Sequence, residues 1–438
     1  MRDAATDDLP DGVRCVILGV SDLNGILRGK RIAAAHWPHV QAHGVALENL
    51  VFALDIGSKR IANDWTGHHT GSPDVHLRPV GPLRPVPWEE GTMFALGAAT
   101  EASGEASPLD PRPALLRVLD RARAMGLEMS LGAELEFYLY DPVTLRPRED
   151  RHDCYGLDRA ADMEHVLAPI RDGLIAMGLP VEQSNPEFAP GQVEVNTRHA
   201  PAAEAVEHAL ILRAMVKQIA RAHGLRATFM PKPWADRSGS GLHMHHSARI
   251  TEGAEFAGRA AFAADGRLSA MGRAYLAGMQ RRLPETALVG APLPNSYRRR
   301  TPYSYAPTVA AWGYDNRSVA LRVIEGADAA VRIEAREAGA DANPWLLAAV
   351  QIAAGLEGIA EGLTPDAPVA GDGYAAPGRA PIPCTMRDAL AAARGSAFLR
   401  DVLGEHLTGL MITQAEQEQA RVDAEITAVE TARYLEAM

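Results

Sequence analysis

Four short segments of the chain share one pattern, in which apolar residues alternate with glutamate, histidine or arginine. Strict alternation over a few residues predicts a β-strand with one apolar and one polar face. A single segment of this kind has a plainer interpretation, because antiparallel sheets often carry a solvated face. Surface strands usually carry Thr, Lys and Gln, whereas these carry ligand-type side chains. The segments are GAELEFYLY (132–140), GQVEVNT (191–197), GLHMHHS (241–247) and VRIEAR (331–336).

The polar faces of these segments predict a metal site with bound anions. A site rich in carboxylates and poor in soft ligands selects hard cations, Mg²⁺ or Mn²⁺, and Mg²⁺ is typically shared with substrate phosphates. Arginine recognises carboxylate and phosphate groups. Metal ions and arginines together are the ingredients of phosphoryl transfer. His246 falls on the opposite face from His243 and His245, which predicts a structural role for it.

Other common catalytic motifs are missing from the sequence. The segment SGSGLH (238–243) is rich in glycine but lacks the Gly-Lys-Ser/Thr ending of a P-loop, and no dinucleotide-binding glycine motif occurs in the right context. No Gly-x-Ser-x-Gly elbow stands between a strand and a helix. A nucleotide site here must therefore be of another type.

The net charge limits the possible binding partners, and the cysteine content and N-terminus limit the possible cellular compartment. The 438 residues carry a formal net charge of −11, which argues against binding of nucleic acid or of anionic membranes, so that local arginine clusters must serve small anions. The acidic N-terminus predicts no signal peptide, and the longest apolar run (344–360) is too short for a membrane span and contains Gln351 and Glu357. Three scattered cysteines fit a reducing cytoplasm.

The organisation predicted along the chain is two domains, residues 1–107 and 108–438. Residues 13–31 read as a hairpin with a turn at Leu23-Asn24-Gly25, and residues 72–98 as further strands. A Gly/Ser/Pro-rich linker precedes residue 107, and apolar residues at helical spacing follow it. Helices are predicted near 111–126, 160–178, 201–223, 268–282, 341–362 and 414–437.

Six segments, in this order, resemble motifs of the glutamine synthetase family over nearly the whole chain. They are GAELEF, EFAPGQVEVN, ATFMPKPWADRSGSGLHMHHS, NSYRRR…AP, WGYDNRSVALRV and VRIEAREAGADANPWL. The resemblance implies an α+β fold, with a small N-terminal β-grasp domain and a large catalytic domain built on an antiparallel half-barrel sheet surrounded by helices. It also implies stacked rings, usually dodecamers of two hexamers, with active sites between neighbouring subunits. The family reaction uses ATP to convert glutamate to γ-glutamyl phosphate, which ammonia or an amine attacks.

The resemblance also assigns roles to individual residues. One metal ion, Mg²⁺ or Mn²⁺, would be held by Glu136, Glu187 and Glu194, and a second, nearer the ATP phosphates, by Glu134, His243 and Glu334. ATP contacts would come from Glu182, His245, Ser247, Arg322 and Arg332. Arg299, Arg336 and the Gly239 backbone would hold glutamate, and Arg317 would lie over the transferred phosphoryl group. Arg298 and Arg300, which flank Arg299, are expected at solvent or at an interface.

Two positions depart from the family members that use ammonia. Those enzymes carry a glutamate in a Gly-Tyr-Glu-Ala-Pro segment, where this chain has Tyr305. A phenol with a pKa of about 10 is neutral at pH 7 and cannot replace a carboxylate as a ligand for ammonium, but its ring suits the carbon chain of an amine. Asp55 occupies the position of a second ammonium-site residue, in the altered surroundings VFALDIGSKR.

These departures predict a glutamate–amine ligase most similar to the γ-glutamylpolyamine synthetase (glutamate–putrescine ligase) branch. Its substrates would be ATP, L-glutamate and an alkyl amine, diamine or polyamine such as putrescine, and it would begin amine catabolism. Asp55 and Tyr305 would act at the acceptor site. The first alternative is a glutamine synthetase that uses ammonia and tolerates the tyrosine. The second is an inactive homologue with a structural or sensing role, against which the complete set of metal ligands argues.

Overall fold

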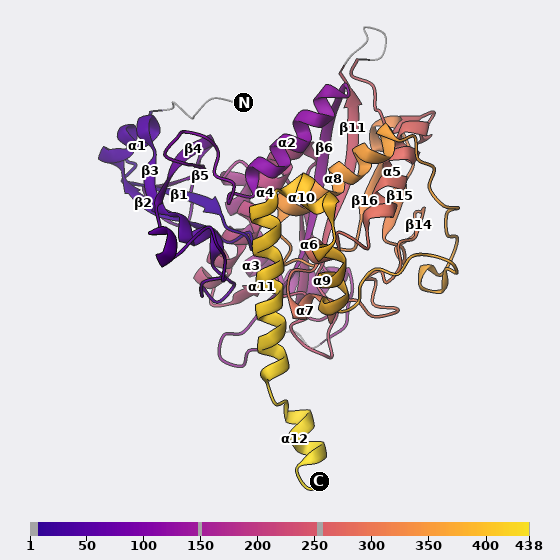
Figure 1. The fold of residues 1–438 in the computed structure, drawn as a ribbon. Helices are drawn as coiled ribbons and strands as arrows, with labels where there is room; N and C mark the ends of the chain where they lie inside the picture. Colours follow the sequence, from indigo (N-terminus) through magenta and orange to yellow (C-terminus); the bar gives the residue numbers. More distant parts are fainter. Residues whose placement is uncertain (1–7, 148–150, 252–256, 438) are drawn as a thin grey trace.

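The structure, a computed structural model, describes residues 8–147, 151–251 and 257–437. It has the α+β architecture that the resemblance implies, with two large sheets, a separate two-stranded sheet, and helices around the largest one. The smaller sheet and α1 lie at one side of the molecule, and the long strands and the other helices form the rest (Figure 1). None of the described helices combines the length and apolar character needed to cross a membrane.

The first sheet is built around the predicted hairpin. Its strands follow the order β2-β1-β5-β4-β3, with β1 and β5 parallel at the centre. The hairpin turns at Gly25, whose positive φ of 65° is a backbone conformation that glycine adopts without strain. The register pairs Ser21 with Leu27. The strands are β1 (Cys15–Ser21), β2 (Leu27–Ala33), β3 (Val45–Glu48), β4 (Asp74–Pro85) and β5 (Thr92–Thr100).

The second sheet contains all four predicted strands as direct neighbours. Its order is β14-β15-β16-β11-β6-β8-β7, and β9 and β10 also pair with β6. The pairings β16–β11, β11–β6 and β6–β8 are antiparallel, so the polar faces of the four strands meet on one side. The strands are β6 (Leu127–Tyr140), β7 (Val181–Pro186), β8 (Gln192–Thr197), β9 (Ala200–Pro201), β10 (Arg226–Thr228), β11 (Leu242–Ile250), β14 (Trp312–Tyr314), β15 (Leu321–Ile324) and β16 (Arg332–Ala335), with a separate pair β12 (Ala263–Ala264) and β13 (Arg267–Leu268).

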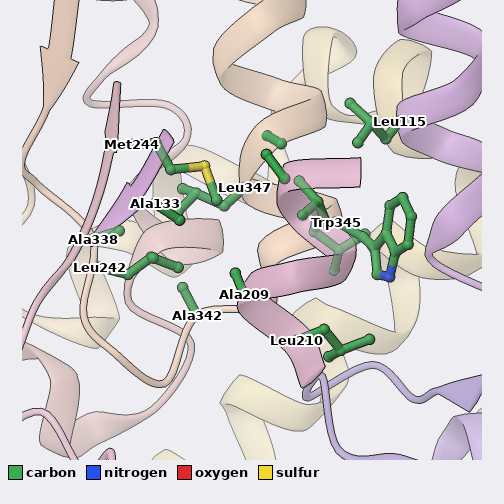
Figure 2. Packing of buried hydrophobic residues seen from close by; sticks show 14 of the residues in the cluster. Leu115, Ala133, Ala209, Leu210, Leu242, Met244, Ala338, Ala342, Trp345 and Leu347 are labelled. Atoms are coloured by element: carbon green, nitrogen blue, oxygen red, sulfur yellow. The ribbon is translucent and has the colours of Figure 1, made fainter. Parts of the chain in front are cut away.

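Helices cover the apolar face of the second sheet and leave the polar face to the site. Leu135, Val195 and Leu242 are fully buried, and α2 and α4 contact β6 while α8 packs on both helices. Figure 2 shows Ala133, Leu242 and Met244 of the sheet beside Leu347 and Ala209 of the helices. Burial of these side chains contributes about 1.5–3 kcal/mol for each large aliphatic residue. The helical layer therefore fixes the strands whose other face carries the carboxylates.

Five of the six predicted helices are confirmed to within a few residues. They are α2 (Arg112–Ala124), α3 (Leu157–Ala176), α4 (Ala202–Ala222), α5 (Ala270–Arg282) and α8 (Pro344–Ala360). The division into domains near residue 107 stays a prediction; in the structure β5 ends at Thr100 and α2 begins at Arg112. The remaining helices are α1 (Trp37–His43), α6 (Ala287–Gly290), α7 (Pro294–Tyr297), α9 (Met386–Arg394), α10 (Ala397–Leu403), α11 (Glu405–Ala424) and α12 (Ala428–Tyr434).

The prediction of one helix over 414–437 is wrong. The structure has two helices there, α11 and α12, separated by the extended residue Glu425. Thr427 begins α12 with a capping box, in which its hydroxyl accepts from the amide of Glu430 and the Glu430 carboxylate accepts from the amide of Thr427. The local hydrogen bonds of this cap compete with a continuous helix. Figure 1 shows α12 projecting away from the rest of the chain.

Candidate active site

The strand register brings the predicted acidic and histidine side chains into direct cross-strand pairs. Glu134 lies opposite His243, and Glu136 lies opposite Glu194. His245 lies opposite Glu334. The exposed fractions of His243 and Glu194 are 4% and 7%, and Glu334 is fully buried. The polar face of the sheet is therefore not an ordinary solvated face.

Two groups of three side chains place their ligand atoms within 4.8 Å of one another: Glu134, Glu194 and His243, and Glu134, His245 and Glu334. Glu134 belongs to both groups and so stands at the centre of the acidic cluster. His245, which the resemblance assigns to ATP, lies close to these carboxylates, with its Nε2 2.9 Å from Glu134 Oε1. His243 Nδ1 lies 3.4 Å from Glu134 Oε2 and 3.6 Å from Glu334 Oε1.

The crowding of carboxylates favours a bound cation. Burial and the charge of Glu187 raise the pKa of Glu136 to about 7. Burial and neighbouring carboxylates also raise the pKa of Glu187 and of Glu194. His243 Nε2 is buried and has no hydrogen-bond partner among the described residues. A hard divalent cation would neutralise these carboxylates and use the free imidazole nitrogen, so the residues present fit such an ion.

Two of the carboxylates are held ionised by cationic neighbours. Burial alone would raise the pKa of Glu134, but its hydrogen bonds with His243 and His245 lower it. Burial acts in the same way on Glu334, yet the charges of Arg336 and the two histidines lower its pKa to about 2. Arg336 and Arg322 both donate to the Glu334 carboxylate, Arg322 at 2.9 Å. These arginines thus fix one wall of the acidic cluster.

Arg299 is buried beside this cluster, next to Gly239. Its guanidinium donates to the carbonyls of Glu337 and Arg336, each at 3.3 Å, and burial lowers its pKa to about 10. A Cβ atom on Gly239 would lie 2.5 Å from Arg299 Cγ and 2.8 Å from the carbonyl oxygen of Pro231. The structure therefore brings together three predicted anion-site positions, 239, 299 and 336.

Replacing Gly239 by alanine is expected to lower kcat/KM for glutamate at least about tenfold, because a displacement of Arg299 by about 1 Å can cost a hundredfold. The matched control is Gly395→Ala, where an added Cβ meets no atom within 4 Å and φ is negative. We expect kcat/KM for glutamate in the control to stay within about twofold of the value for the parent chain. Steady-state phosphate release over a range of glutamate concentrations is the measurement. Equal kcat/KM values for glutamate in the two variants would contradict the close packing of Gly239 against Arg299.

The remaining predicted nucleotide-site residues lie on or beside the same sheet. Arg332 Nε donates to His245 Nδ1 at 3.2 Å, and Ser247 lies two residues further along β11 on the same face. Glu182 is an exposed residue of β7, the last strand of the sheet path. Arg317 is exposed in the loop after β14. Burial raises the pKa of Glu187 and the charge of Arg317 opposes this rise, which places Arg317 near the acidic cluster.

Tyr303 and Tyr305 lie in an exposed stretch of chain next to the buried Arg299. Tyr303 and Tyr305 are 74% and 58% exposed, and both have positive φ. The ring of Tyr374, from a distant loop, has its centroid 5.3 Å from that of Tyr303. Burial raises the pKa of Tyr374, and the charges of Arg299 and Arg336 oppose this shift.

Asp55 lies elsewhere in the chain, against the C-terminal helices. Its carboxylate is buried, accepts from the amides of Gly57 and Lys59, and pairs with Arg421 Nη2 at 2.6 Å. No interaction joins Asp55 to Tyr305 or to the acidic cluster within the described residues.

Sequence reasoning missed three residues near the site. Burial and the charges of Glu187 and Glu194 raise the pKa of Tyr155 to about 12, while Arg317 opposes this, so the phenol stands at the rim of the cluster. Arg159 is fully buried and donates to the carbonyls of Glu187, Ala189 and Gln192 at 3.2, 2.8 and 3.4 Å, which holds the loop that carries Glu187. Tyr374 is the third. All three lie in loops or on helices, outside the alternating pattern that revealed the other residues.

The predictions for residues next to the site have mixed outcomes. His246 is fully buried and contacts Tyr275 Oη at 2.9 Å and Gln351 Oε1 at 3.0 Å, which confirms its structural role. Arg298 is exposed, as expected. The expectation of solvent or interface is wrong for Arg300, which is 3% exposed and donates to the carbonyls of Pro383 and Glu337 within the chain. These carbonyls, from distant segments, satisfy its charge.

Comparison with known proteins agrees with this geometry. Residues 108–434 match the family described as "Glutamine synthetase, catalytic domain". A glutamate–isopropylamine ligase of a Pseudomonas species is 32% identical, with 96% of this chain and 94% of that protein covered. The γ-glutamylethanolamide synthetase GlnA4 of Streptomyces coelicolor is 33% identical, with 97% and 93% covered. The γ-glutamylputrescine synthetase PuuA of Escherichia coli is 34% identical, with 88% and 84% covered.

Solved structures show the same fold. A GmaS–ADP complex has a TM-score of 0.86 and 26% sequence identity, and the alignment covers 97% of each chain. The glutamine synthetase family uses ATP and divalent metal ions, which the acidic cluster can accommodate. The chain therefore belongs to the glutamine synthetase family, as an ATP-dependent carbon–nitrogen ligase of the glutamate–amine or glutamate–ammonia class.

Proposed function

We propose that the chain joins L-glutamate to an alkyl amine, with a diamine or polyamine such as putrescine as the expected acceptor. ATP phosphorylates the γ-carboxylate of glutamate, with release of ADP, and the amine nitrogen then attacks the acyl phosphate. The amine loses a proton, phosphate leaves, and a γ-glutamylamide forms. The observation that carries the choice of acceptor is Tyr305 in place of a carboxylate, near the contacting rings of Tyr303 and Tyr374; these three residues are the tyrosine cluster.

In this proposal the acidic cluster holds two Mg²⁺ or Mn²⁺ ions, one through Glu136, Glu187 and Glu194 and the other through Glu134, His243 and Glu334. Such ions supply charge neutralisation between the phosphates of ATP and the γ-carboxylate. The proximity of His245 to Glu134 supports a contact of this imidazole with the second ion as well as with ATP. Glu182, Ser247, Arg322 and Arg332 are proposed to contact the nucleotide.

The arginines are proposed to hold the substrate anions. Arg299, buried beside Gly239, and Arg336 would bind the α-carboxylate of glutamate, because the Arg299 guanidinium donates only to carbonyls and a buried guanidinium without a carboxylate partner is costly. Arg336 Nε is a buried donor with no partner among the described residues, which supports this role. Arg317, exposed in the loop after β14, would lie over the phosphoryl group during transfer.

The acceptor site is proposed to combine residues of two subunits in a homo-oligomer, expected to be a dodecamer of two hexameric rings. Tyr155, Tyr303, Tyr305 and Tyr374 would supply aromatic faces to the carbon chain and cation–π contact to a protonated nitrogen. Asp55 of a neighbouring chain would supply the negative charge. Within the described residues of one chain, Asp55 pairs with Arg421 and contacts none of the acidic cluster, which supports this arrangement.

Replacing Tyr305 by glutamate should shift preference from alkyl amines toward ammonia, because a carboxylate attracts ammonium and its charge disfavours the apolar chain of an amine. We expect the ratio of kcat/KM for ammonia to that for putrescine to rise at least about tenfold. The control is Tyr434→Glu, an equivalent change at a half-exposed tyrosine of α12. An unchanged amine profile in the Tyr305 variant would show that this residue does not line the acceptor site.

The principal alternative is a glutamine synthetase that uses ammonia. Glutamine synthetases are also among the similar proteins, and one from Thermus thermophilus is 35% identical over 312 residues. Tyr305, where a carboxylate is expected, favours an amine over ammonia. An inactive homologue is disfavoured by the paired, buried ligand residues of the acidic cluster.

A further inference from the structure

The loop that carries Arg317 is held against a segment that is distant in the sequence. The loop joins β14 to β15, and segment 366–374 lies between α8 and α9. The amide of Val369 donates to the carbonyl of Trp312 at 2.8 Å, and Trp312 Nε1 donates to the carbonyl of Asp366 at 2.7 Å. The first part of segment 366–374 is therefore fixed on β14, the strand that leads into the loop.

Asn316, which precedes Arg317, bonds to this segment through its side chain. Its Nδ2 donates to the carbonyls of Val369 and Gly371 at 3.1 and 2.8 Å. Its Oδ1 accepts from the amide of Ser318 at 2.9 Å and from the Ser318 hydroxyl at 2.7 Å. One half-buried side chain thus links the distant segment to the residue that follows Arg317.

Ser318 also contacts this segment, at a point where the two backbones lie very close together. Its Oγ accepts from the amide of Gly373 at 2.8 Å. A Cβ atom on Gly373 would lie 2.5 Å from the carbonyl oxygen of Ser318, and a Cβ atom on Gly313 of β14 would lie 2.5 Å from the carbonyl oxygen of Val369. Side chains do not fit at either point, so glycine at positions 313 and 373 permits this close contact.

Arg317 differs from its neighbours in this loop. The Asp315 carboxylate accepts from Arg322 Nε at 3.1 Å, and the amide of Asp315 donates to the carbonyl of Val323 at 2.9 Å. The Arg317 side chain is exposed and makes no hydrogen bond or ion pair with any residue that the structure describes. The loop therefore holds the backbone on both sides of residue 317 and leaves its guanidinium available to an anion.

A fixed backbone matters for a cation that acts on a transferred group. Such a cation stabilises developing charge best when its position is set before the reaction. Ordering a loose loop at the moment of reaction costs conformational entropy, and a displacement of about 1 Å can cost about a hundredfold in rate. Since the Arg317 side chain has no partner among the described residues, its position depends on the backbone that Asn316 and Ser318 hold.

The same segment leads to the tyrosine cluster. It ends at Tyr374, whose ring centroid lies 5.3 Å from that of Tyr303. The amide of Tyr374 donates to the Asp372 carboxylate at 2.9 Å, which begins one turn of 3₁₀ helix. Segment 366–374 therefore contacts the loop of Arg317 with one part and carries a tyrosine of the cluster at its end.

We infer that Asn316 and Ser318 are positioning residues, which act through Arg317 by anchoring its loop to segment 366–374. This inference rests on the role proposed above for Arg317 at the transferred phosphoryl group. It adds that the distant segment, which belongs to neither β14 nor β15, sets the place of the guanidinium.

The test is a double-mutant cycle on the full-length protein with Asn316→Ala and Arg317→Met. Turnover is measured as ADP release with glutamate, ATP, Mg²⁺ and hydroxylamine, a small nucleophile that intercepts the acyl phosphate whatever amine the enzyme prefers. We expect Asn316→Ala to lower kcat at least about tenfold and Arg317→Met at least about a hundredfold. The double variant should be at most about twofold slower than Arg317→Met, because Asn316 acts through Arg317. The KM values for glutamate and ATP should stay within about threefold, since the loss falls on the transition state.

A matched pair of serine variants gives an independent test. Ser396 Oγ accepts from the amide of Leu399 at 2.9 Å and donates to the Glu285 carboxylate, so Ser396→Ala removes hydroxyl hydrogen bonds similar to those removed by Ser318→Ala. We expect Ser318→Ala to lower kcat at least about fivefold and Ser396→Ala to keep kcat within about twofold of the value for the parent chain.

Three results would overturn the inference. One is that Asn316→Ala lowers kcat by the same factor in the Arg317→Met chain as in the parent chain. Another is that Ser318→Ala and Ser396→Ala have equal kcat. The third is that Asn316→Ala lowers only the melting temperature, which would make it a purely structural contact. An unchanged kcat in Arg317→Met alone is distinguishable from these, because it would refute the proposed role of Arg317 and the inference with it.

Discussion

Replacing Glu134 by glutamine should lower ligase turnover at least about a thousandfold and leave the fold intact. Glu134 belongs to both groups of potential metal ligands, so the change removes one negative charge from each. Charge neutralisation by a metal is worth several kcal/mol in the transition state, and each 1.36 kcal/mol is about a tenfold change in rate. The measurement is phosphate release with glutamate, ATP and putrescine, together with a Mn²⁺ binding titration.

The control for this variant lies on the same strand. Glu128→Gln is the same chemical change on β6, six residues away and on an exposed side chain. It should keep turnover within about twofold and leave Mn²⁺ affinity unchanged. Because the charge of Glu134 repels Glu187 and Glu194, its removal should not lower the melting temperature by more than a few degrees. Turnover within tenfold of the parent chain would show that the cluster does not hold the catalytic metal.

Replacing Arg299 by methionine should lower kcat/KM for glutamate at least about a hundredfold. Truncating one partner of a buried, hydrogen-bonded charge pair costs about 2–5 kcal/mol. Arg299 would form such a pair with glutamate, because it is only 5% exposed and lies beside Gly239. The neighbouring Arg298 is exposed, so Arg298→Met makes the same change one residue away. We expect kcat/KM for glutamate in this control to stay within about threefold of the value for the parent chain.

Further measurements separate a substrate role for Arg299 from a structural one. The KM for ATP should change far less than the KM for glutamate, and Arg299→Lys should restore part of the activity because it keeps the charge. Equal losses for glutamate and ATP, together with a lowered melting temperature, would mean that the hydrogen bonds to Glu337 and Arg336 are what the substitution removes.

The alternating pattern was sufficient to predict the acidic cluster. Side chains alternate with a period of two along a strand, so Glu134 with Glu136 and His243 with His245 had to share a face wherever their strands paired. The register that places Glu134 opposite His243 is a tertiary feature, set by the packing of the apolar faces on α2, α4 and α8. The family resemblance assigns the roles of these residues. The structure shows that they are buried, so the polar face of the sheet is not an ordinary solvated face.

Residues outside the strands could not be found in this way. Tyr155 has a positive φ of 58° in a loop, and no periodicity relates it to Glu187. Arg300 was expected at solvent or an interface because an arginine run looks exposed, yet distant carbonyls of Pro383 and Glu337 bury it. The sequence predicts one helix over 414–437, while the structure has two, because the chain is extended at Glu425 and the capping box at Thr427 begins a new helix.

The most direct test of the proposed function is phosphate release with glutamate, ATP and Mg²⁺ or Mn²⁺ across ammonia, ethanolamine, isopropylamine, putrescine and spermidine. One preparation of the enzyme should be assayed with each amine at the same millimolar concentration. The γ-glutamylamide product should be confirmed by mass spectrometry. The proposed role of the tyrosine cluster predicts that at least one alkyl amine or diamine gives kcat/KM at least about tenfold above that of ammonia. Strong turnover with ammonia at millimolar concentration, without a faster amine, would contradict it.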